Sequence, residues 1–407
     1  MPPASSSAAP GQPSPSRSSA ADSPRAEPGD AAHAPSLRDR WLALRDRLLT
    51  SPRFHRWAAA FPPTRAIARR DARALFDVVA GFTYTQVLFA CVRLRVFETL
   101  ADGPLPADAL ARRVGLPAEG AERLFAAAGS LRLIEARSGG RWGIGPLGAP
   151  MLAHPAIGAM VEHHAALYAD LADPVALLRG ERDRTALASY WPYADTAPGA
   201  VPEALPGERV HEYSALMSAS QPLVAEQVLD AYPLHRHRCL LDVGGGEGAF
   251  LRAAAQRAPD LQLMLFDLPP VAERARTRLS EAGLSGRART FGGSFFADPM
   301  PTGADVATLV RVLFDHPDER VLAILRAVRA ALPPDGVLLV CEPMSGTPGA
   351  EAIGDAYYGL YLLAMGRGRS RTPERIEALL REAGFGRVRL LPTRMPMQTR
   401  VMLARPE

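Results

Sequence analysis

The stretch Leu241-Asp242-Val243-Gly244-Gly245-Gly246-Glu247-Gly248 decides the fold of this 407-residue chain. An apolar run that contains an acid passes into a glycine-rich turn, and a helical pattern over residues 249–256 follows at once. Strand, turn and helix in this order form the place where α/β folds bind nucleotides, because glycines let a ligand approach the backbone. Asp267 closes the next apolar run about twenty residues further on, where a carboxylate can accept hydrogen bonds from ribose hydroxyls.

The spacing and charge of this turn restrict its ligand. The glycines follow a Gly-x-Gly-x-Gly pattern, and Ala249 and Phe250 stand where a dinucleotide fingerprint still requires glycine. Asp242 and Glu247 would repel a pyrophosphate but suit S-adenosylmethionine, which carries a sulfonium cation. The turn therefore predicts an S-adenosylmethionine site. The alternatives are a merely structural turn, with Asp267 as a helix cap, and a dinucleotide oxidoreductase, which the spacing disfavours.

Composition limits the class of protein. The 47 basic and 43 acidic side chains give a net charge of +4, and 47% of the residues are hydrophobic, enough for two cores. The three cysteines, Cys91, Cys239 and Cys341, follow no metal-ligand or disulfide spacing, so we expect no metal and a reducing cytoplasm. The start of the chain has no apolar signal region, and no stretch gives eighteen unbroken apolar residues, so neither secretion nor a membrane span is expected.

Four regions follow along the chain. Residues 1–36 have the composition of a disordered tail, and residues 37–150 predict Arg-rich helices and a winged-helix unit. Within that unit a strand pair is expected at 133–136 and 142–144. Its second helix, 121–130, carries Arg123 as its only cation, so we expect no nucleic-acid binding. Residues 151–235 are expected to be helical, and 236–407 to form the cofactor-binding domain.

The last region alternates strands and helices, which predicts an α/β fold with a mostly parallel sheet covered on both faces. Its expected strands are 239–243, 262–267, 289–291, 306–310 and 337–340. The final two, 388–391 and 399–403, are too close for a crossover helix and should form an antiparallel hairpin at one edge.

The glycine turn and four further motifs resemble the O-methyltransferases that act on small hydroxylated natural products. These motifs are Phe266-Asp267-Leu268-Pro269, Gly293-Ser294-Phe295-Phe296, Leu313-Phe314-Asp315-His316-Pro317-Asp318-Glu319 and Gly368-Arg369-Ser370-Arg371-Thr372. The resemblance covers roughly residues 37–405. It implies a Rossmann-like class I methyltransferase domain preceded by a winged-helix dimerisation domain, and a homodimer. The cofactor-binding residues are then Asp242, Gly244, Gly245, Gly246, Glu247, Asp267, Leu268, Ser294, Phe295 and Arg311.

Within that family, residues 61–71, 76–82 and 171–176 are similar to the bacterial carotenoid branch. The likeness implies methylation of the tertiary 1-hydroxyl of acyclic carotenoids in photosynthetic bacteria, by a cytoplasmic enzyme in peripheral contact with the photosynthetic membrane. A long apolar acceptor pocket follows. The expected lining is Phe82, Tyr84, Phe89, Tyr168, Tyr357, Tyr358, Tyr361 and Met365. Residues of this kind more often belong to an ordinary core.

The chain departs from the family at two positions. Relatives of the plant type place a catalytic histidine where Phe314 stands, and many carry an adenine-binding aspartate where Ser294 stands. Methyl transfer can rely largely on holding the acceptor oxygen in line. The candidate proton acceptors are His316, Asp315 and His164, with His163 beside the last. Because adjacent residues face different sides of a helix, we expect at most one of His163 and His164 to point into the pocket.

Two alternatives remain at this stage. A methyltransferase of the same fold could act on another hydrophobic hydroxyl, such as a phenol, quinol or polyketide. A cofactor-sensing regulator without catalysis would fit Phe314 and the winged-helix unit, although the helix at 121–130 is poor in cations.

Overall fold

In a computed structural model of the chain, the described residues are 36–182, 184–190 and 220–407. By its internal contacts the chain divides into two units, Met1–Ala80 and Gly81–Glu407. The expected disordered tail lies outside the described residues except for Ser36, which caps the first helix. The regional boundaries given above remain predictions.

The first unit contains α1 (Leu37–Leu49), α2 (Pro52–Ala60) and the first part of α3 (Pro62–Arg93). Ser36 starts α1 with a capping box that it shares with Asp39, and Ser51 caps α2. The expected Arg-rich helices are therefore confirmed. Helix α1 buries none of its residues, and α2 buries only Ala58.

The second unit opens with a small α/β region that follows α3. It contains α4 (Val96–Thr99), β1 (Leu105–Pro106), α5 (Ala107–Arg113), α6 (Ala118–Ser130), β2 (Ile134–Arg137), β3 (Arg141–Ile144) and α7 (Ala149–Ala153). The strands form an antiparallel sheet in the order β1-β3-β2, and the predicted strand pair is confirmed. Phe97, Phe125 and Ile134 fill its core. On α6, Arg123 is paired with Glu119 at 2.7 Å, which neutralises the one cation of that helix.

A seven-stranded sheet forms the frame of the larger domain. Its strands are β4 (Cys239–Val243), β5 (Gln262–Asp267), β6 (Ala288–Gly292), β7 (Val306–Val310), β8 (Val337–Glu342), β9 (Arg389–Leu391) and β10 (Arg400–Ala404). The order is β6-β5-β4-β7-β8-β10-β9, with the first five parallel. The predicted strands and the antiparallel hairpin are confirmed. In addition, β10 pairs with β8, so the hairpin joins the sheet through its second strand.

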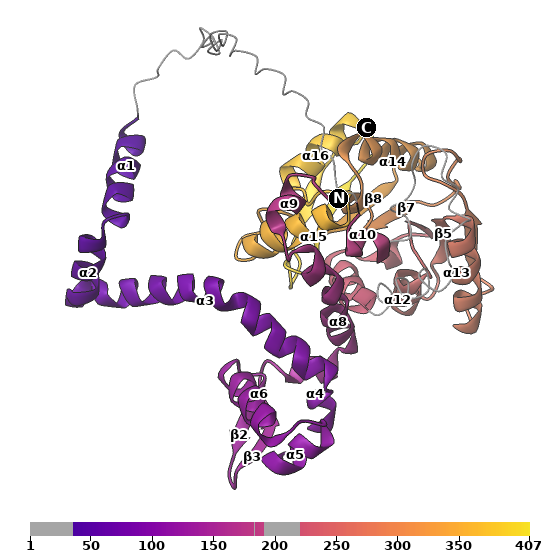
Figure 1. The fold of residues 1–407 in the computed structure, drawn as a ribbon. Helices are drawn as coiled ribbons and strands as arrows, with labels where there is room; N and C mark the ends of the chain where they lie inside the picture. The colour runs from indigo at the N-terminus through magenta and orange to yellow at the C-terminus, as the bar shows by residue number, and fades with distance from the viewer. Residues whose placement is uncertain (1–35, 183, 191–219) are drawn as a thin grey trace, which may run out of the picture. The chain divides into compact units, whose positions relative to one another are not determined.

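Helices cover both faces of this sheet (Figure 1). They are α12 (Ala249–Arg257), α13 (Pro269–Glu281), α14 (Asp318–Ala331) and α16 (Pro373–Glu382), with short 3-10 turns η2 (Leu234–Arg236) and η3 (Leu313–Asp315). Leu241 and Val243 face the core under α14 and α16, whereas Leu240 faces the core under α12 and α13. Burial on both faces explains why the strands are continuous apolar runs rather than alternating ones.

A group of helices follows the small sheet and precedes the large one in the sequence, and three of them contact α15 (Tyr358–Ala364) near the C-terminal end. It contains α8 (Pro155–Asp170), α9 (Pro174–Leu178), α10 (Ala186–Tyr190) and helical residues 220–231. Helix α8 contacts α15, which continues the π-helix η4 (Ala352–Tyr357). A π-helix is rare and often marks a functional site.

Helix α3 is the most apolar exposed element of the described chain. Several of its large side chains are open to solvent, namely Ile67, Leu75, Phe76, Val78, Val79 and Phe82. By length and composition alone α3 could cross a membrane, although its apolar part contains Asp77. An uncovered face of this kind is also what a second protein subunit covers.

Candidate active site

The sheet order defines where a ligand would bind. Strand β4 pairs in parallel with β5 on one side and with β7 on the other, so the order in which the strands are added to the sheet reverses at β4. Val243 lies opposite both Phe266 and Leu309, which brings the carboxyl ends of the three strands to one edge. Ligands of open α/β sheets bind at such a switch point. The glycine turn follows β4 directly and therefore lies there.

The glycine turn needs its glycines for two separate reasons. Gly244, Gly246 and Gly248 have φ angles of 70°, 58° and 77°, a region that side-chain-bearing residues rarely adopt. Gly245 has an ordinary backbone, but a Cβ there would lie 2.5 Å from Asp242 Oδ2. The turn thus folds tightly over the end of β4, and a Cβ at Gly246 would meet open space.

Asp267 joins the end of β5 to this turn. Its Oδ2 accepts a hydrogen bond from Gly246 N at 2.8 Å, and its Oδ1 accepts one from Leu268 N at 2.7 Å. Burial raises its pKa to about 6, although these amides favour the charged form. Each carboxylate oxygen keeps a further lone pair, so Asp267 can accept from a ligand's hydroxyls while it holds the loop.

Asp242 lies beneath the same turn and is almost completely buried. Its Oδ1 accepts a hydrogen bond from Thr308 Oγ1 at 2.7 Å, while Oδ2 has no partner among the described residues. Burial, with a smaller contribution from the neighbouring Asp267, raises its pKa to about 7. Two close carboxyl groups would repel a pyrophosphate and favour a cation. The site therefore fits S-adenosylmethionine better than a dinucleotide.

Three other expected cofactor residues surround the turn. The Glu247 carboxylate is held by α13, through Arg274 at 3.3 Å and Arg278 at 3.8 Å, so it fixes the turn to that helix. The Phe295 ring lies beside Gly244 and 6.0 Å from the Phe266 ring. The Ser294 side chain is engaged locally, since its Oγ accepts from Phe296 N. Direct contacts of these residues with a cofactor remain predictions.

Asp315, which follows β7, and Glu342, which ends β8, form a second acidic pair. Glu342 Oε1 accepts hydrogen bonds from Val312 N at 3.0 Å and Leu313 N at 2.7 Å. Its Oε2 has no partner among the described residues, and neither has Asp315 Oδ1. Burial raises the pKa of Glu342 to about 7; burial and Glu342 together raise the pKa of Asp315 well above its usual range, against the opposing effect of Arg311.

His316 stands immediately after this pair. Its ring meets the edges of Phe295 at 6.5 Å and Phe296 at 5.8 Å between centroids. Burial, together with the nearby Arg320, Arg367 and Arg371, lowers its pKa to about 4. The ring is therefore neutral at pH 7 and only a weak base. The loop itself is fixed by Arg371, whose guanidinium donates to the carbonyls of Leu313 and His316.

His163 and His164 both meet the tyrosines of the π-helix and α15. His163 Nε2 lies 2.9 Å from Tyr361 Oη, and His164 Nε2 lies 2.8 Å from Tyr357 Oη. The expectation that at most one of them points into the acceptor pocket stays a prediction, because these contacts place both rings against tyrosines and not in a pocket. Successive side chains on a helix diverge by only about 100°, and the two tyrosines, four residues apart, receive both. Burial lowers the pKa of both histidines.

The expected acceptor-pocket residues divide into two groups. Tyr361 and Met365 belong to one buried apolar cluster with Leu167, and Phe314 and Tyr357 pack against it. Tyr358 meets the Phe314 ring at 6.3 Å, and Tyr168 lies 6.2 Å from His164. Phe82 does not join them in the single chain, where 75% of its surface is exposed on α3, and its place in the pocket stays a prediction. Hydrophobicity in the sequence does not distinguish residues that line a pocket from residues on a surface that a second subunit covers.

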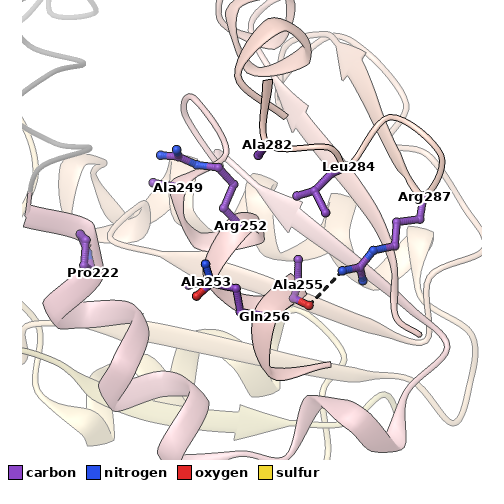
Figure 2. A pocket seen from close by; sticks show the side chains of 9 residues that line it. All are labelled: Pro222, Ala249, Arg252, Ala253, Ala255, Gln256, Ala282, Leu284 and Arg287. Atoms are coloured by element: carbon purple, nitrogen blue, oxygen red, sulfur yellow. Dashed lines mark hydrogen bonds between the residues drawn. The ribbon is translucent and has the colours of Figure 1, made fainter. Parts of the chain in front are cut away.

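A pocket of about 390 Å³ is lined by side chains of α12, by Pro222 and by the segment 282–287 (Figure 2). Arg287 lines it, and its guanidinium donates to the carbonyls of Ala255, Ala258 and Leu261. The bond to Ala255 satisfies a carbonyl in the last turn of α12, and the other two fix the segment that follows the helix. No group of three metal-ligating side chains occurs among the described residues.

Family comparisons agree with this site. The family model of the O-methyltransferase domain matches residues 168–386, and that of the O-methyltransferase dimerisation domain matches residues 76–153. The chain belongs to this O-methyltransferase family, is an O-methyltransferase, and uses S-adenosylmethionine as methyl donor. The dimerisation domain supports a homodimer.

Particular relatives are similar over most of their length. The chain is 47% identical to demethylspheroidene O-methyltransferase of Cereibacter sphaeroides, over 86% of this chain and 91% of that one. It is 43% identical to the enzyme of the same name from Rhodobacter capsulatus, over 88% of each chain. Human N-acetylserotonin methyltransferase, solved with S-adenosylmethionine, is 27% identical and has a TM-score of 0.68, over 83% of this chain and 97% of that one.

Sequence reasoning missed one functional candidate. Glu342 ends β8, and its signal was available, since a single acid closes an apolar run of five residues. Tyr357 was expected as pocket lining, and only the fold brings it to His164.

Replacing Asp267 should weaken cofactor binding. Asp267→Ala removes a charge-assisted acceptor for the ribose and leaves Gly246 N without its partner, so we expect a loss of about 1.5–3 kcal/mol in S-adenosylmethionine affinity by calorimetry. Asp260→Ala, at an exposed position after α12, serves as the matched control and should bind normally. Equal affinity in both variants would contradict the assigned site.

Glu342 should make the free energy of unfolding depend on pH. Because its pKa in the folded protein, about 7, lies above the ordinary value of 4.5, its stability contribution is complete below about pH 4.5 and is lost as the pH rises through 7. Glu342→Gln removes this loss, which amounts to at most about 3 kcal/mol. Denaturant unfolding at several pH values should show the difference between variant and wild type; exposed Glu122→Gln should show none. Parallel curves for Glu342→Gln and wild type would refute the raised pKa.

Proposed function

We propose that this enzyme methylates the tertiary 1-hydroxyl of an acyclic carotenoid, and that it does so in the cytoplasm at the surface of the photosynthetic membrane. The observation that carries the proposal is the 47% and 43% identity to two proteins named demethylspheroidene O-methyltransferase. The alternative acceptors are phenols, as other relatives are named acetylserotonin and phenazine O-methyltransferases at 34% and 30% identity.

The surroundings of the switch point support a hydrophobic acceptor. Phe314, Tyr358 and Tyr361 put aromatic surface next to the Asp315 loop, where relatives of the plant type have a histidine. A polyene has many carbons and few polar atoms, so it gains most of its binding free energy by burial against such surface. An apolar ring at position 314 increases that burial.

The bound cofactor would supply an electrophilic methyl group on its sulfonium. Asp267 and the glycine turn would hold its ribose, and the buried Asp242 would favour its positive charge. The chain's remaining task is to hold the acceptor oxygen in line with that methyl group, which can lower the barrier by several kcal/mol. A tertiary alcohol loses its proton as the new bond forms, so a weak acceptor suffices.

The acceptor should be tested by its chemistry and by its length. Incubation with labelled S-adenosylmethionine should methylate 1-hydroxycarotenoids in preference to phenols, quinols and polyketides. A short tertiary alcohol should show a lower kcat as well as a higher KM, because contacts along the polyene hold the oxygen in line. Preferred methylation of a phenol would replace the carotenoid proposal, and an equal kcat for the short alcohol would refute the role of the chain contacts.

His316 should contribute little to the proton transfer. Its pKa of about 4 makes it a weak base, so His316→Ala should lower kcat less than tenfold and leave cofactor affinity unchanged. Asp315→Asn and His164→Ala test the other two candidates in the same assay. A loss of about 10²–10⁴-fold in one variant, with normal cofactor binding, would identify a general base and overturn catalysis by positioning.

A further inference from the structure

We propose that α1 and α2 form a membrane-surface anchor that recognises anionic lipid headgroups. The inference goes beyond methyl transfer, because it concerns a segment outside the cofactor and acceptor sites. It gives a physical means by which the enzyme would reach a lipid-soluble acceptor.

Helix α1 carries a stripe of apolar side chains, and Leu42 and Leu49 are its large apolar residues that lie outside the stripe. At about 100° per residue, Leu37, Trp41, Leu44 and Leu48 lie within about 30° of one direction. Arg38 and Arg45 flank this stripe on one side and Arg40 and Arg47 on the other, each at about 70–90°. Asp39 and Asp46 lie on the opposite face. An apolar stripe with Trp and Leu between rows of arginine is typical of helices that lie in a membrane interface.

The stripe is exposed rather than packed. Leu37, Trp41, Leu44 and Leu48 are 84%, 61%, 56% and 44% exposed, and no residue of α1 is buried. Helix α2 continues the apolar surface with Trp57, whose ring stacks on Phe61 at 5.1 Å. Exposed tryptophan and arginine together favour the headgroup region of a bilayer, where an indole can stay partly hydrated.

Charge decides between a bilayer and a second protein chain. Residues 37–73 contain ten arginines and three aspartates, a net charge of +7, whereas the whole chain has +4, so the remainder is net acidic. Arg38, Arg40 and Arg47 have no carboxylate within ion-pair distance in the described chain. Two copies of this segment would repel each other, and the matched dimerisation domain begins only at residue 76. Anionic lipid complements the charge.

The test is co-sedimentation of the full chain with vesicles. Binding is expected to vesicles of phosphatidylcholine with phosphatidylglycerol, to be much weaker to phosphatidylcholine alone, and to fall at high salt. Arg40→Glu/Arg47→Glu should weaken binding at least about tenfold. Arg113→Glu/Arg289→Glu changes the charge of the chain equally at exposed positions elsewhere and should keep most of the binding.

The apolar stripe is tested in the same assay. Leu44→Ser/Leu48→Ser should also weaken binding at least about tenfold, whereas Leu147→Ser/Leu178→Ser, at equally exposed leucines, should not. All of these variants should keep the oligomeric mass and the activity on a water-soluble short alcohol or phenol. Equal loss in the control variants, or no binding to anionic vesicles, would overturn the proposal. Dissociation of the dimer by the α1 variants would assign the stripe to a second copy instead. Neither result bears on the acceptor, which is identified without vesicles.

Discussion

The parallel pairing of β4 between β5 and β7 is the constraint on which the rest of the site depends. It brings the ends of three strands to one edge, and each strand is followed there by a residue with a separate task. After β4 the glycine turn lets a ligand approach the backbone, at the end of β5 Asp267 holds that turn, and after β7 the 311–315 loop contains the candidate proton acceptor Asp315. None of these side chains is near another in sequence. Because both faces of the sheet are buried, a shift of one residue in register would cost the core as well as the site.

The site contains buried acidic groups whose ionised forms a bound cation would stabilise. Asp242, Asp267, Asp315 and Glu342 are acidic groups whose pKa values are raised, chiefly by burial. Oxygens of Asp242, Asp315 and Glu342 lack partners among the described residues. Folding alone gains nothing from such groups, since each charged form is poorly solvated. A positively charged ligand interacts favourably with the ionised forms, so cofactor binding and proton release from the site are coupled.

The sequence predicted the frame of the fold more completely than it predicted the site. Continuous apolar runs located β4, β5 and β7 to the residue, and the glycine turn with Asp267 located the cofactor end, because both signals are local. The expected pocket residues come from distant parts of the sequence, so no local pattern locates them. Phe82 was expected to line the pocket, but hydrophobicity alone does not predict what covers a side chain. Likewise, the angle between the side chains of His163 and His164 does not predict the positions of the two tyrosines, of α15 and the π-helix, that they contact. Only tertiary packing supplies those positions.

Phe314 connects the chemistry to the choice of acceptor. A histidine at that position would have to be desolvated among Tyr357, Tyr361 and Leu167, and the neighbouring His316 shows the consequence, since burial and nearby arginines lower its pKa to about 4. A base weakened in this way assists little, whereas a phenyl ring adds apolar surface that a polyene can bury. For a phenol, which is acidic enough to be deprotonated beforehand, losing the base would be costly. For a tertiary alcohol, whose proton leaves only as the bond forms, the exchange of a base for better positioning is favourable. The departure from the family at this residue is therefore consistent with an acceptor that is a long, weakly acidic alcohol.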